Sequence, residues 1–265
     1  MPNTHYKKSL GQNFLTDETV IRKIIQSAEL QKEDVVLEIG PGKGILTEAL
    51  AARCQKVIAV EIDQNLIPVL KNRFRAVKNV EIVNEDILNL DTEKIITNYQ
   101  LPVTDYRIIA NLPYYITSPI IRKFLEAEKP PAEMILMVQK EVAERITAQP
   151  GEMSILGVAV QYYATAEILF NVPRTAFDPV PEVDSAVIRI SNLKFRISNS
   201  EKDAFFRIVR AGFCARRKTL ANNLTNSFHL ERKEVAEKLA QANIAPSTRA
   251  QELSVEDWKK LAELF

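Results

Sequence analysis

The chain has 265 residues, of which 46% are apolar and 26% are charged, an ordinary balance for a soluble globular protein with material for a large core and a smaller one. Its net charge is +1, and no apolar run approaches the ~20 residues that a membrane-spanning helix needs, so no membrane contact is expected. The chain has only two cysteines, Cys54 and Cys214, which predicts a protein of the reducing cytoplasm. Neither these cysteines nor His5 and His229 have the spacing of metal ligands, so no bound metal is expected.

Helix and strand patterns alternate along the first half of the chain. Helical spacing of apolar residues begins after Thr16 or Asp17, either of which suits an N-cap, and continues to Leu30. Further helices are predicted over residues 45–52, 65–75 and 119–128. Strands are predicted over residues 34–39, 56–60, 80–83, 106–111, 133–138 and 185–193. These strands are nearly continuous apolar runs, which is typical of a parallel sheet covered on both faces, so the predicted fold is α/β.

The character of the sequence changes after the last predicted strand. A polar segment at Ser198–Ser200 is followed by helical patterns alone. We therefore place a domain boundary near Phe195, which divides the chain into a catalytic domain over residues 1–194 and a small all-helical domain over residues 195–265. From residue 185 to the end, 15 Lys and Arg residues stand against 9 Asp and Glu residues, so the positive charge is concentrated there.

One stretch of the helical domain is purely basic. Between Phe205 and Lys218 there is no acidic residue. The basic residues are Arg207, Arg210, Arg216, Arg217 and Lys218. Such a cluster on an otherwise balanced chain is what binding to an anionic polymer requires, although a solvated helix face is the simpler interpretation.

Three glycines separate the first predicted strand of the sheet from the helix that follows. Gly40, Gly42 and Gly44 suit a tight turn that lets a ligand approach the backbone closely. Such turns occur in enzymes that use NAD, FAD or S-adenosylmethionine, so the turn alone does not separate these classes. Glu61 ends the next strand about 20 residues later, as does an acid that accepts hydrogen bonds from ribose hydroxyls.

The next two strands also end in polar side chains. Asp86 follows the third strand and suits an adenine amine, while Asn111 ends the fourth and opens the tetrapeptide Asn111–Tyr114. An Asn-x-Pro segment can simply end a strand and start a turn. A nicotinamide enzyme would explain the glycines and Glu61 but gives no reason for Asp86 and Asn111. A methyltransferase explains all four positions, so it is the favoured class.

The motifs along essentially the whole chain resemble those of the small-subunit (16S) rRNA adenine N6-dimethyltransferases, the KsgA family. The matching segments are Lys8-Ser9-Leu10-Gly11-Gln12-Asn13-Phe14-Leu15, Glu38-Ile39-Gly40-Pro41-Gly42, Val60-Glu61-Ile62-Asp63, Glu85-Asp86, Asn111-Leu112-Pro113-Tyr114, Phe177-Asp178-Pro179-Val180-Pro181 with Val183-Asp184-Ser185, and Arg216-Arg217-Lys218-Thr219-Leu220. The chain departs from the family at Tyr115, where relatives often carry asparagine or histidine, and at Cys214, where a polar residue is expected.

The resemblance implies a class I S-adenosylmethionine methyltransferase fold, Rossmann-like with a mostly parallel sheet. It implies S-adenosylmethionine as the methyl donor, without a metal. The residues expected to contact the cofactor are Gln12, Asn13, Leu15, Gly40, Gly42, Glu61, Ile62, Asp86 and Asn111. Asn111 would face both the cofactor and the target amine, while Tyr114 and Phe177 would sandwich the target base. The alternative for Phe177 is a core aromatic residue at the end of a loop.

The chemistry expected at Asn111 needs no general base. An adenine amine is a poor nucleophile because its lone pair is delocalised into the ring. Accepting its two N–H groups with the Asn111 side-chain oxygen and the Leu112 carbonyl would localise that lone pair toward the methyl group. The resemblance implies dimethylation of adjacent adenosines in a loop near the 3′ end of small-subunit rRNA, coupled to ribosome biogenesis. The basic cluster would contact rRNA phosphates, and a monomer is expected.

Three alternatives remain at this point. A large-subunit rRNA adenine methyltransferase of the macrolide-resistance type shares the Gln-Asn-Phe and Asn-x-Pro-Tyr motifs. A small-subunit assembly factor with a minor catalytic role would bind the same partner. A nicotinamide oxidoreductase is the most distant alternative. The segment around Gln12 and Asn13 is expected to fold over the cofactor as a lid, with a disordered tail as the other possibility.

Overall fold

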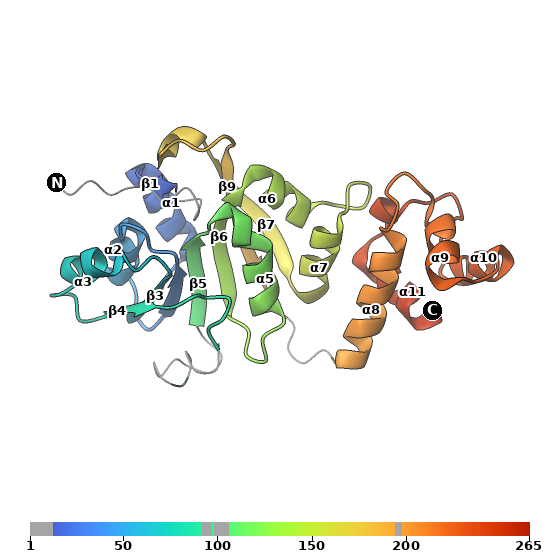
Figure 1. The fold of residues 1–265 in the computed structure, drawn as a ribbon, viewed down its shortest axis with the longest axis horizontal. Coiled ribbons are helices and arrows are strands. Elements are labelled where there is room, and N and C mark those ends of the chain that lie inside the picture. Colours follow the sequence, from blue (N-terminus) through green and yellow to red (C-terminus); the bar gives the residue numbers. More distant parts are fainter. Residues whose placement is uncertain (1–12, 92–96, 98–105, 194–197) are drawn as a thin grey trace. The chain divides into compact units, whose positions relative to one another are not determined.

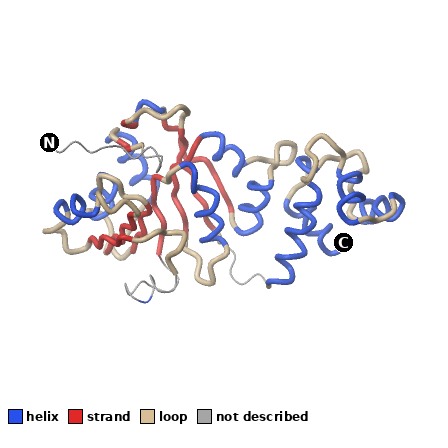
Figure 2. Tube along the Cα trace, viewed as in Figure 1, coloured by secondary structure: helices blue, strands red, loops and turns tan. Residues whose placement is uncertain are grey.

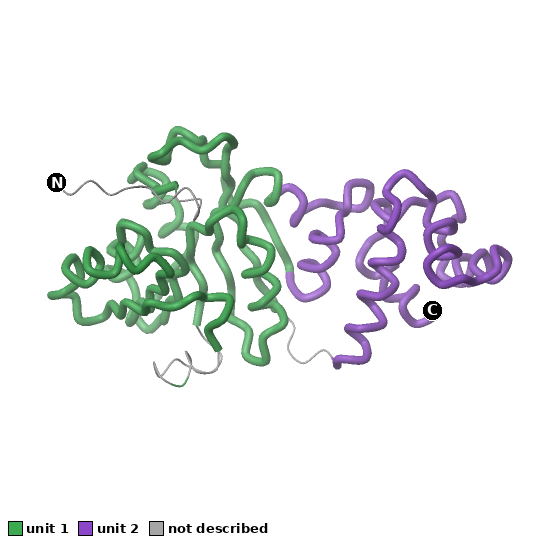
Figure 3. The backbone as a smooth tube through the Cα atoms, in the orientation of Figure 1, with its two compact units in different colours: residues 1–143, 165–193 green, residues 144–164, 194–265 purple. Residues whose placement is uncertain are grey.

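The computed structural model describes residues 13–91, 97, 106–193 and 198–265 (Figure 1). Gln12, a predicted cofactor contact, lies outside this range. The chain divides into two compact units (Figure 3). Unit 1 comprises residues 1–143 and 165–193, and unit 2 comprises residues 144–164 and 194–265. No helix of the described residues is long and apolar enough to cross a membrane.

Unit 1 is built on a seven-stranded sheet. Its strands are β2 (Val35–Ile39), β3 (Lys56–Glu61), β4 (Val80–Asn84), β5 (Tyr106–Asn111), β6 (Glu133–Gln139), β7 (Thr165–Val172) and β9 (Ser185–Ser191). They lie in the order β4-β3-β2-β5-β6-β9-β7. The first five are parallel, and β9 runs antiparallel to both β6 and β7. The mostly parallel sheet predicted from the sequence is thus confirmed.

Helices cover both faces of this sheet (Figure 2). They are α1 (Glu18–Ala28), α2 (Ile45–Ala51), α3 (Ile67–Arg73) and α5 (Thr117–Leu125), with short 3₁₀ helices η2 (Tyr114–Ile116) and η3 (Arg174–Ala176). The N-cap of α1 is Asp17, whose carboxylate accepts from the Thr19 N–H at 2.7 Å. Every residue of β2 is buried, as expected for a strand covered on both sides. The carboxyl ends of the parallel strands therefore converge at one edge, where ligands of open α/β sheets bind.

A network of ion pairs joins the amino ends of the parallel strands, opposite the ends where ligands bind. The Arg107 guanidinium, at the start of β5, pairs with Asp34 at 2.8 Å and with Glu133 of β6. Arg189 of β9 also pairs with Glu133, at 3.4 Å. Because these side chains are largely removed from solvent, losing one partner would leave an uncompensated charge. The network therefore holds the amino ends of the strands together, while the predicted ligand-binding site lies at their carboxyl ends.

Three strands were not predicted from the sequence. β7 lies at the edge of the sheet, and most of its residues are at least partly exposed, so it lacks the apolar run that marks a buried strand. β1 (Phe14–Leu15) and β8 (Phe177–Asp178) contain two residues each and form a separate antiparallel pair. Strands this short depend on a partner far away in the sequence, which no local pattern reveals.

The part of unit 2 that the structure describes is all-helical. Its elements are α7 (Ile155–Tyr163), α8 (Asn199–Gly212), α9 (Leu220–Phe228), α10 (Arg232–Gln241), η4 (Ala250–Glu252) and α11 (Val255–Leu264), and α6 (Lys140–Thr147) runs into it from unit 1. The predicted division at residue 194 differs from the observed one in residues 144–164, which join unit 2. The reason is aromatic packing, since Tyr162 of α7 stacks on Phe205 of α8 with ring centroids 3.9 Å apart.

Candidate active site

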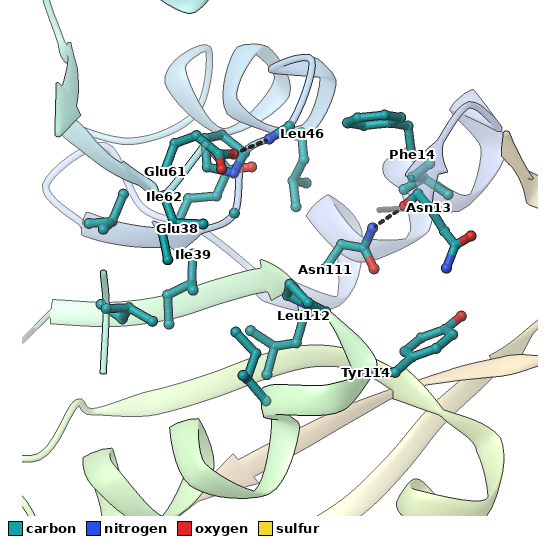
Figure 4. Close-up of a pocket in the computed structure, with 18 of the residues that line it drawn as sticks. Asn13, Phe14, Glu38, Ile39, Leu46, Glu61, Ile62, Asn111, Leu112 and Tyr114 are labelled. Atoms are coloured by element: carbon teal, nitrogen blue, oxygen red, sulfur yellow. Dashed lines mark hydrogen bonds between the residues drawn. The ribbon is translucent and has the colours of Figure 1, made fainter. Parts of the chain in front are cut away.

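A cavity of about 250 Å³ opens at the carboxyl ends of the parallel strands of unit 1 (Figure 4). Its walls contain every predicted cofactor and catalytic residue that the structure describes. These are Asn13, Leu15, Gly40, Gly42, Glu61, Ile62, Asp86, Asn111, Leu112, Tyr114 and Phe177. The fold thus brings residues separated by more than 160 positions in the sequence around one space large enough for a small molecule.

The glycine turn after β2 forms the floor beneath this space. Gly40 and Gly42 have positive φ angles of 68° and 58°, a region that side chains other than glycine rarely adopt. The Gly40 N–H donates to the Val60 carbonyl at 2.9 Å, which ties the turn to β3. A Cβ atom on Gly42 would lie 2.9 Å from the Phe14 ring. The turn therefore keeps its shape only with glycine at these positions.

Glu61 is held in a fixed orientation at the end of β3. One carboxylate oxygen accepts from the Asp63 N–H at 2.8 Å, and the other accepts from the Gly42 N–H at 3.2 Å. Burial raises the pKa of this carboxyl above its usual value, and these backbone bonds partly oppose the effect. Each oxygen retains a lone pair, so the group is preorganised to accept from a pair of hydroxyls.

Asp86 and Ile62 form another part of the cavity wall. The Asp86 carboxylate accepts from the Leu88 N–H and from the Asn89 side-chain amide, both at 2.9 Å. These bonds fix the turn after β4 and leave one lone pair on each oxygen for a ligand. The Ile62 side chain is 47% exposed and offers an apolar surface. The two residues together suit a flat ring that carries an amino group.

Asn111 lies between Glu61 and Tyr114 in the cavity wall (Figure 4). Its side-chain nitrogen donates to the Asn13 backbone carbonyl at 3.4 Å, which leaves the amide oxygen as the acceptor. The Leu112 N–H donates to the Met137 carbonyl at 3.1 Å, and this bond fixes the peptide that follows β5. The Pro113 carbonyl, which follows that of Leu112, already accepts a hydrogen bond from the Ile116 N–H at 3.2 Å.

Tyr114 and Phe177, the two predicted stacking aromatics, differ in exposure. The Tyr114 hydroxyl shares a hydrogen bond of 2.7 Å with the Ser185 side chain, which orients its partly exposed ring. Phe177 lines the cavity but is only 2% exposed and packs in the apolar core with Leu15 and Ala176. Phe177 therefore has a core role whether or not it also meets a ligand.

A model of the ribosomal RNA adenine dimethylase family matches residues 3–265. The chain belongs to this family. Two relatives named ribosomal RNA small subunit methyltransferase A, from Streptococcus thermophilus (strain CNRZ 1066) and Streptococcus pneumoniae (strain P1031), are 44% and 45% identical over 265 residues, or 97% of this chain and 91% of each relative.

Two solved structures resemble the dimethylase along its length. A dimethyladenosine transferase from Plasmodium falciparum is 28% identical with a TM-score of 0.78, and the match covers 94% of this chain and 95% of that chain. The 23S rRNA methyltransferase ErmE is 29% identical with a TM-score of 0.75, covering 95% and 99%. The predicted methyltransferase fold and enzyme class are confirmed, and the nicotinamide alternative is wrong.

One acid in the dimethylase cavity was not assigned a role from the sequence. Glu38 lies within β2, is 2% exposed and lines the cavity, and its Oε2 atom has no hydrogen-bond partner among the described residues. Burial raises the pKa of this carboxyl to about 8, with the Thr47 side chain opposing the shift and the charge of Glu61 adding to it. A charged residue inside an otherwise apolar buried strand is the sequence signal that would have singled it out.

We expect Glu38→Gln to remove a pH dependence from the stability of the free dimethylase. Because burial raises the pKa of this carboxyl in the folded protein to about 8, folding favours the protonated form, and stability is lost as pH rises from the usual carboxyl range, about 4.5, toward 8. At pH 9 the variant should be more stable than the wild type by on the order of 2–4 kcal/mol, a difference that shrinks toward pH 5. Thermal melting across this pH range measures it. Glu33→Gln, at an exposed glutamate, is the control, and parallel curves for both variants would contradict the expectation.

The predicted basic residues of unit 2 fall into two groups. Arg216, Arg217 and Lys218 lie in the turn between α8 and α9, are exposed, and form no side-chain hydrogen bond or ion pair with described residues. Arg210 on α8 is exposed as well. Arg207 instead donates to the Phe265 carbonyl at 2.9 Å and lies over the Phe228 ring. Its guanidinium is therefore partly engaged in holding the end of the chain.

Proposed function

We propose that this dimethylase transfers methyl groups from S-adenosylmethionine to the exocyclic amines of adjacent adenosines in a loop near the 3′ end of small-subunit rRNA. The observation that carries the proposal is the position of Asn111. Its amide oxygen lies in the same cavity as the backbone-held carboxylate of Glu61. One space therefore offers acceptors for an adenine amine and for ribose hydroxyls, which a methyl transfer between two adenosine-containing molecules requires.

The residues of the cavity fit S-adenosylmethionine, which supplies a methyl group that is activated by its sulfonium. Glu61 would accept from the ribose hydroxyls, and Asp86 with Ile62 would hold the adenine ring. Gly40 and Gly42 would leave room for the methionine part, with Asn13 and Leu15 closing over it. The unpartnered oxygen of Glu38 in the same wall is suited to accept from an ammonium group, which the methionine part carries. Gln12 is also proposed to contact S-adenosylmethionine, although it lies outside the residues that the structure describes.

Catalysis then rests on positioning. The Asn111 oxygen and the Leu112 carbonyl would each accept one N–H of the target amine, so that its lone pair points at the methyl carbon. The new C–N bond forms as the C–S bond breaks, and the amine proton passes to water without a general base. After one transfer the nitrogen regains a lone pair and keeps one N–H, which permits the second methylation.

The target base has to leave its stack before it reaches Asn111. This costs a few kcal/mol, and least in a loop. Stacking on Tyr114 and Phe177 would return roughly 1–3 kcal/mol for each stacked face. The hydrogen bond between Tyr114 and Ser185 supports this role because it holds the tyrosine ring in place. Tyr114 is the more accessible of the two rings in this structure.

The basic residues of unit 2 are proposed to bind the phosphates of the rRNA. Arg216, Arg217 and Lys218 are suited to this because they are exposed and have no side-chain partner among the described residues. Phosphate contacts position a protein on RNA without reading its sequence. Arg210 extends the cluster, whereas Arg207 would have to share its guanidinium with the chain terminus. We further propose that the protein acts as a monomer in the cytoplasm.

Two alternatives concern the same site. The similarity to the 23S rRNA methyltransferase ErmE supports large-subunit rRNA as the alternative substrate. At 29% identity, however, this similarity is weaker than the 44–45% identity shared with the small-subunit relatives. A small-subunit assembly factor that methylates only secondarily is compatible with every contact described above. The two roles separate in a variant that binds subunits but cannot methylate them.

A labelled methyl-transfer assay tests the proposal. The purified protein and S-adenosylmethionine are incubated with small subunits from a strain that lacks the modification, and the digested rRNA is analysed by mass spectrometry. We expect dimethyladenosine near the 3′ end of the small-subunit rRNA. Label in large-subunit rRNA alone would support the alternative of a resistance-type methyltransferase. Label in neither rRNA would refute the proposed activity.

A further inference from the structure

The loop that joins β8 to β9 exposes two valines. Val180 is 57% exposed and Val183 is 44% exposed. Single exposed apolar residues are common on protein surfaces and need no explanation. Two within one short loop are different, because this loop starts at Phe177 in the cavity wall and ends at Ser185, the partner of Tyr114. We call residues 178–184 the valine loop; it begins with the last residue of β8 and leads into β9 (Figure 1).

The valine loop is held at both ends and in its middle. At its start, Phe177 pairs with Leu15 in the β1–β8 ladder. At its end, the Asp184 carboxylate accepts from the Arg174 N–H at 2.8 Å, and its carbonyl accepts from the Lys140 N–H at 3.0 Å. Pro181, between the two valines, is buried. The valines are therefore presented to solvent by an anchored backbone, so that ordering them on a partner costs little conformational entropy.

The charges of the valine loop restrict what the valines can contact. Asp178, Glu182 and Asp184 are all exposed. Carboxylates repel the phosphate backbone of RNA, whereas the apolar valine side chains can lie against the face of a base. The loop is therefore suited to meet unpaired or unstacked bases next to the cavity and unsuited to follow the backbone.

We propose, on the basis of the function proposed above, that Val180 and Val183 form an apolar wedge that occupies the gap left when the target adenosine leaves its stack. Apolar side chains inserted between bases are a general means of holding nucleic acid in an unstacked form. The wedge covers the base faces exposed by extrusion, and Tyr114 receives the extruded base. It is a positioning element, because neither valine lines the cavity.

The wedge is tested with two kinds of small subunit. One is assembled around unmethylated rRNA, and the other around the same rRNA from which the base stacked next to the target adenosine has been removed. For Val180→Ser/Val183→Ser we expect kcat/KM on the first to fall roughly tenfold or more, because extrusion is no longer supported. On the second it should fall less than about threefold, because there is no neighbouring base face to cover. Affinity for S-adenosylmethionine and the melting temperature should be unchanged.

The chain offers matched controls for this test. Val69 and Val77 are 44% and 36% exposed and do not line the cavity, so Val69→Ser/Val77→Ser should leave both rates unchanged. Val180→Leu/Val183→Leu keeps the apolar surface and should retain the wild-type rate on intact rRNA. Equal losses on the two substrates, or no loss on either, would overturn the wedge while leaving the methyltransferase intact. A wild-type protein that methylates neither substrate would remove both proposals.

Discussion

Replacing Asn111 with alanine is expected to lower kcat for methyl transfer by roughly 10²–10³-fold, the usual effect of removing one preorganised hydrogen-bonding group from a reacting centre. The variant loses the amide oxygen that would accept from the target amine, so the nitrogen lone pair is no longer directed at the methyl carbon. It also loses the 3.4 Å hydrogen bond to the Asn13 carbonyl. Because that single bond contributes about 1 kcal/mol, affinity for S-adenosylmethionine should weaken by no more than about tenfold.

Single-turnover methylation and calorimetric titration with S-adenosylmethionine measure these two effects separately. Asn171→Ala is the matched control, because it removes an exposed asparagine from β7, a strand at the edge of the same sheet, and should change neither quantity. A kcat for Asn111→Ala within about threefold of the wild type would contradict the assigned acceptor role. A loss confined to cofactor affinity would mean that the residue serves only to hold Asn13.

The fold and most of the cavity were accessible from sequence because they depend on local patterns. Parallel strands buried on both faces appear as apolar runs. A polar residue at the end of such a run therefore lies at the carboxyl end of a strand, where the site forms. Glu61, Asp86 and Asn111 were found in this way. The shape of the glycine turn followed from the positions of Gly40 and Gly42 alone. Such features need no knowledge of distant contacts.

The features that were missed depend on contacts between distant residues. The pairing of Leu15 with Phe177 forms two strands too short to leave a pattern. The stacking of Tyr162 on Phe205 assigns α7 to unit 2, and no pattern within α7 itself reveals that distant partner. The Asn111–Asn13 hydrogen bond, which decides which end of the amide is available, could not be read from either residue. Glu38 did leave a signal, a charge within an apolar strand, but its place in the cavity wall is a property of the folded sheet.

Neutralising Arg216, Arg217 and Lys218 together is expected to weaken binding to the small subunit by roughly 10–150-fold for each phosphate contact that is lost, since charge-assisted hydrogen bonds contribute about 1.5–3 kcal/mol each. Affinity for S-adenosylmethionine should not change. The dependence of the binding constant on salt should also become shallower, by roughly 0.7–0.9 in the logarithmic slope for each contact removed. Binding titrations over a range of salt concentrations give both quantities.

A matched pair of double variants separates a specific cluster from general charge. Arg217→Gln/Lys218→Gln and Arg232→Gln/Lys233→Gln each remove one exposed arginine and one adjacent exposed lysine from unit 2. If the turn between α8 and α9 contacts phosphate, only the first variant loses affinity and slope, because counterions are released only where the RNA lies. Equal effects would mean that the RNA senses the overall charge of the helical unit. The expected inequality would distinguish a contact surface from a solvated helix face, a choice that composition alone left open.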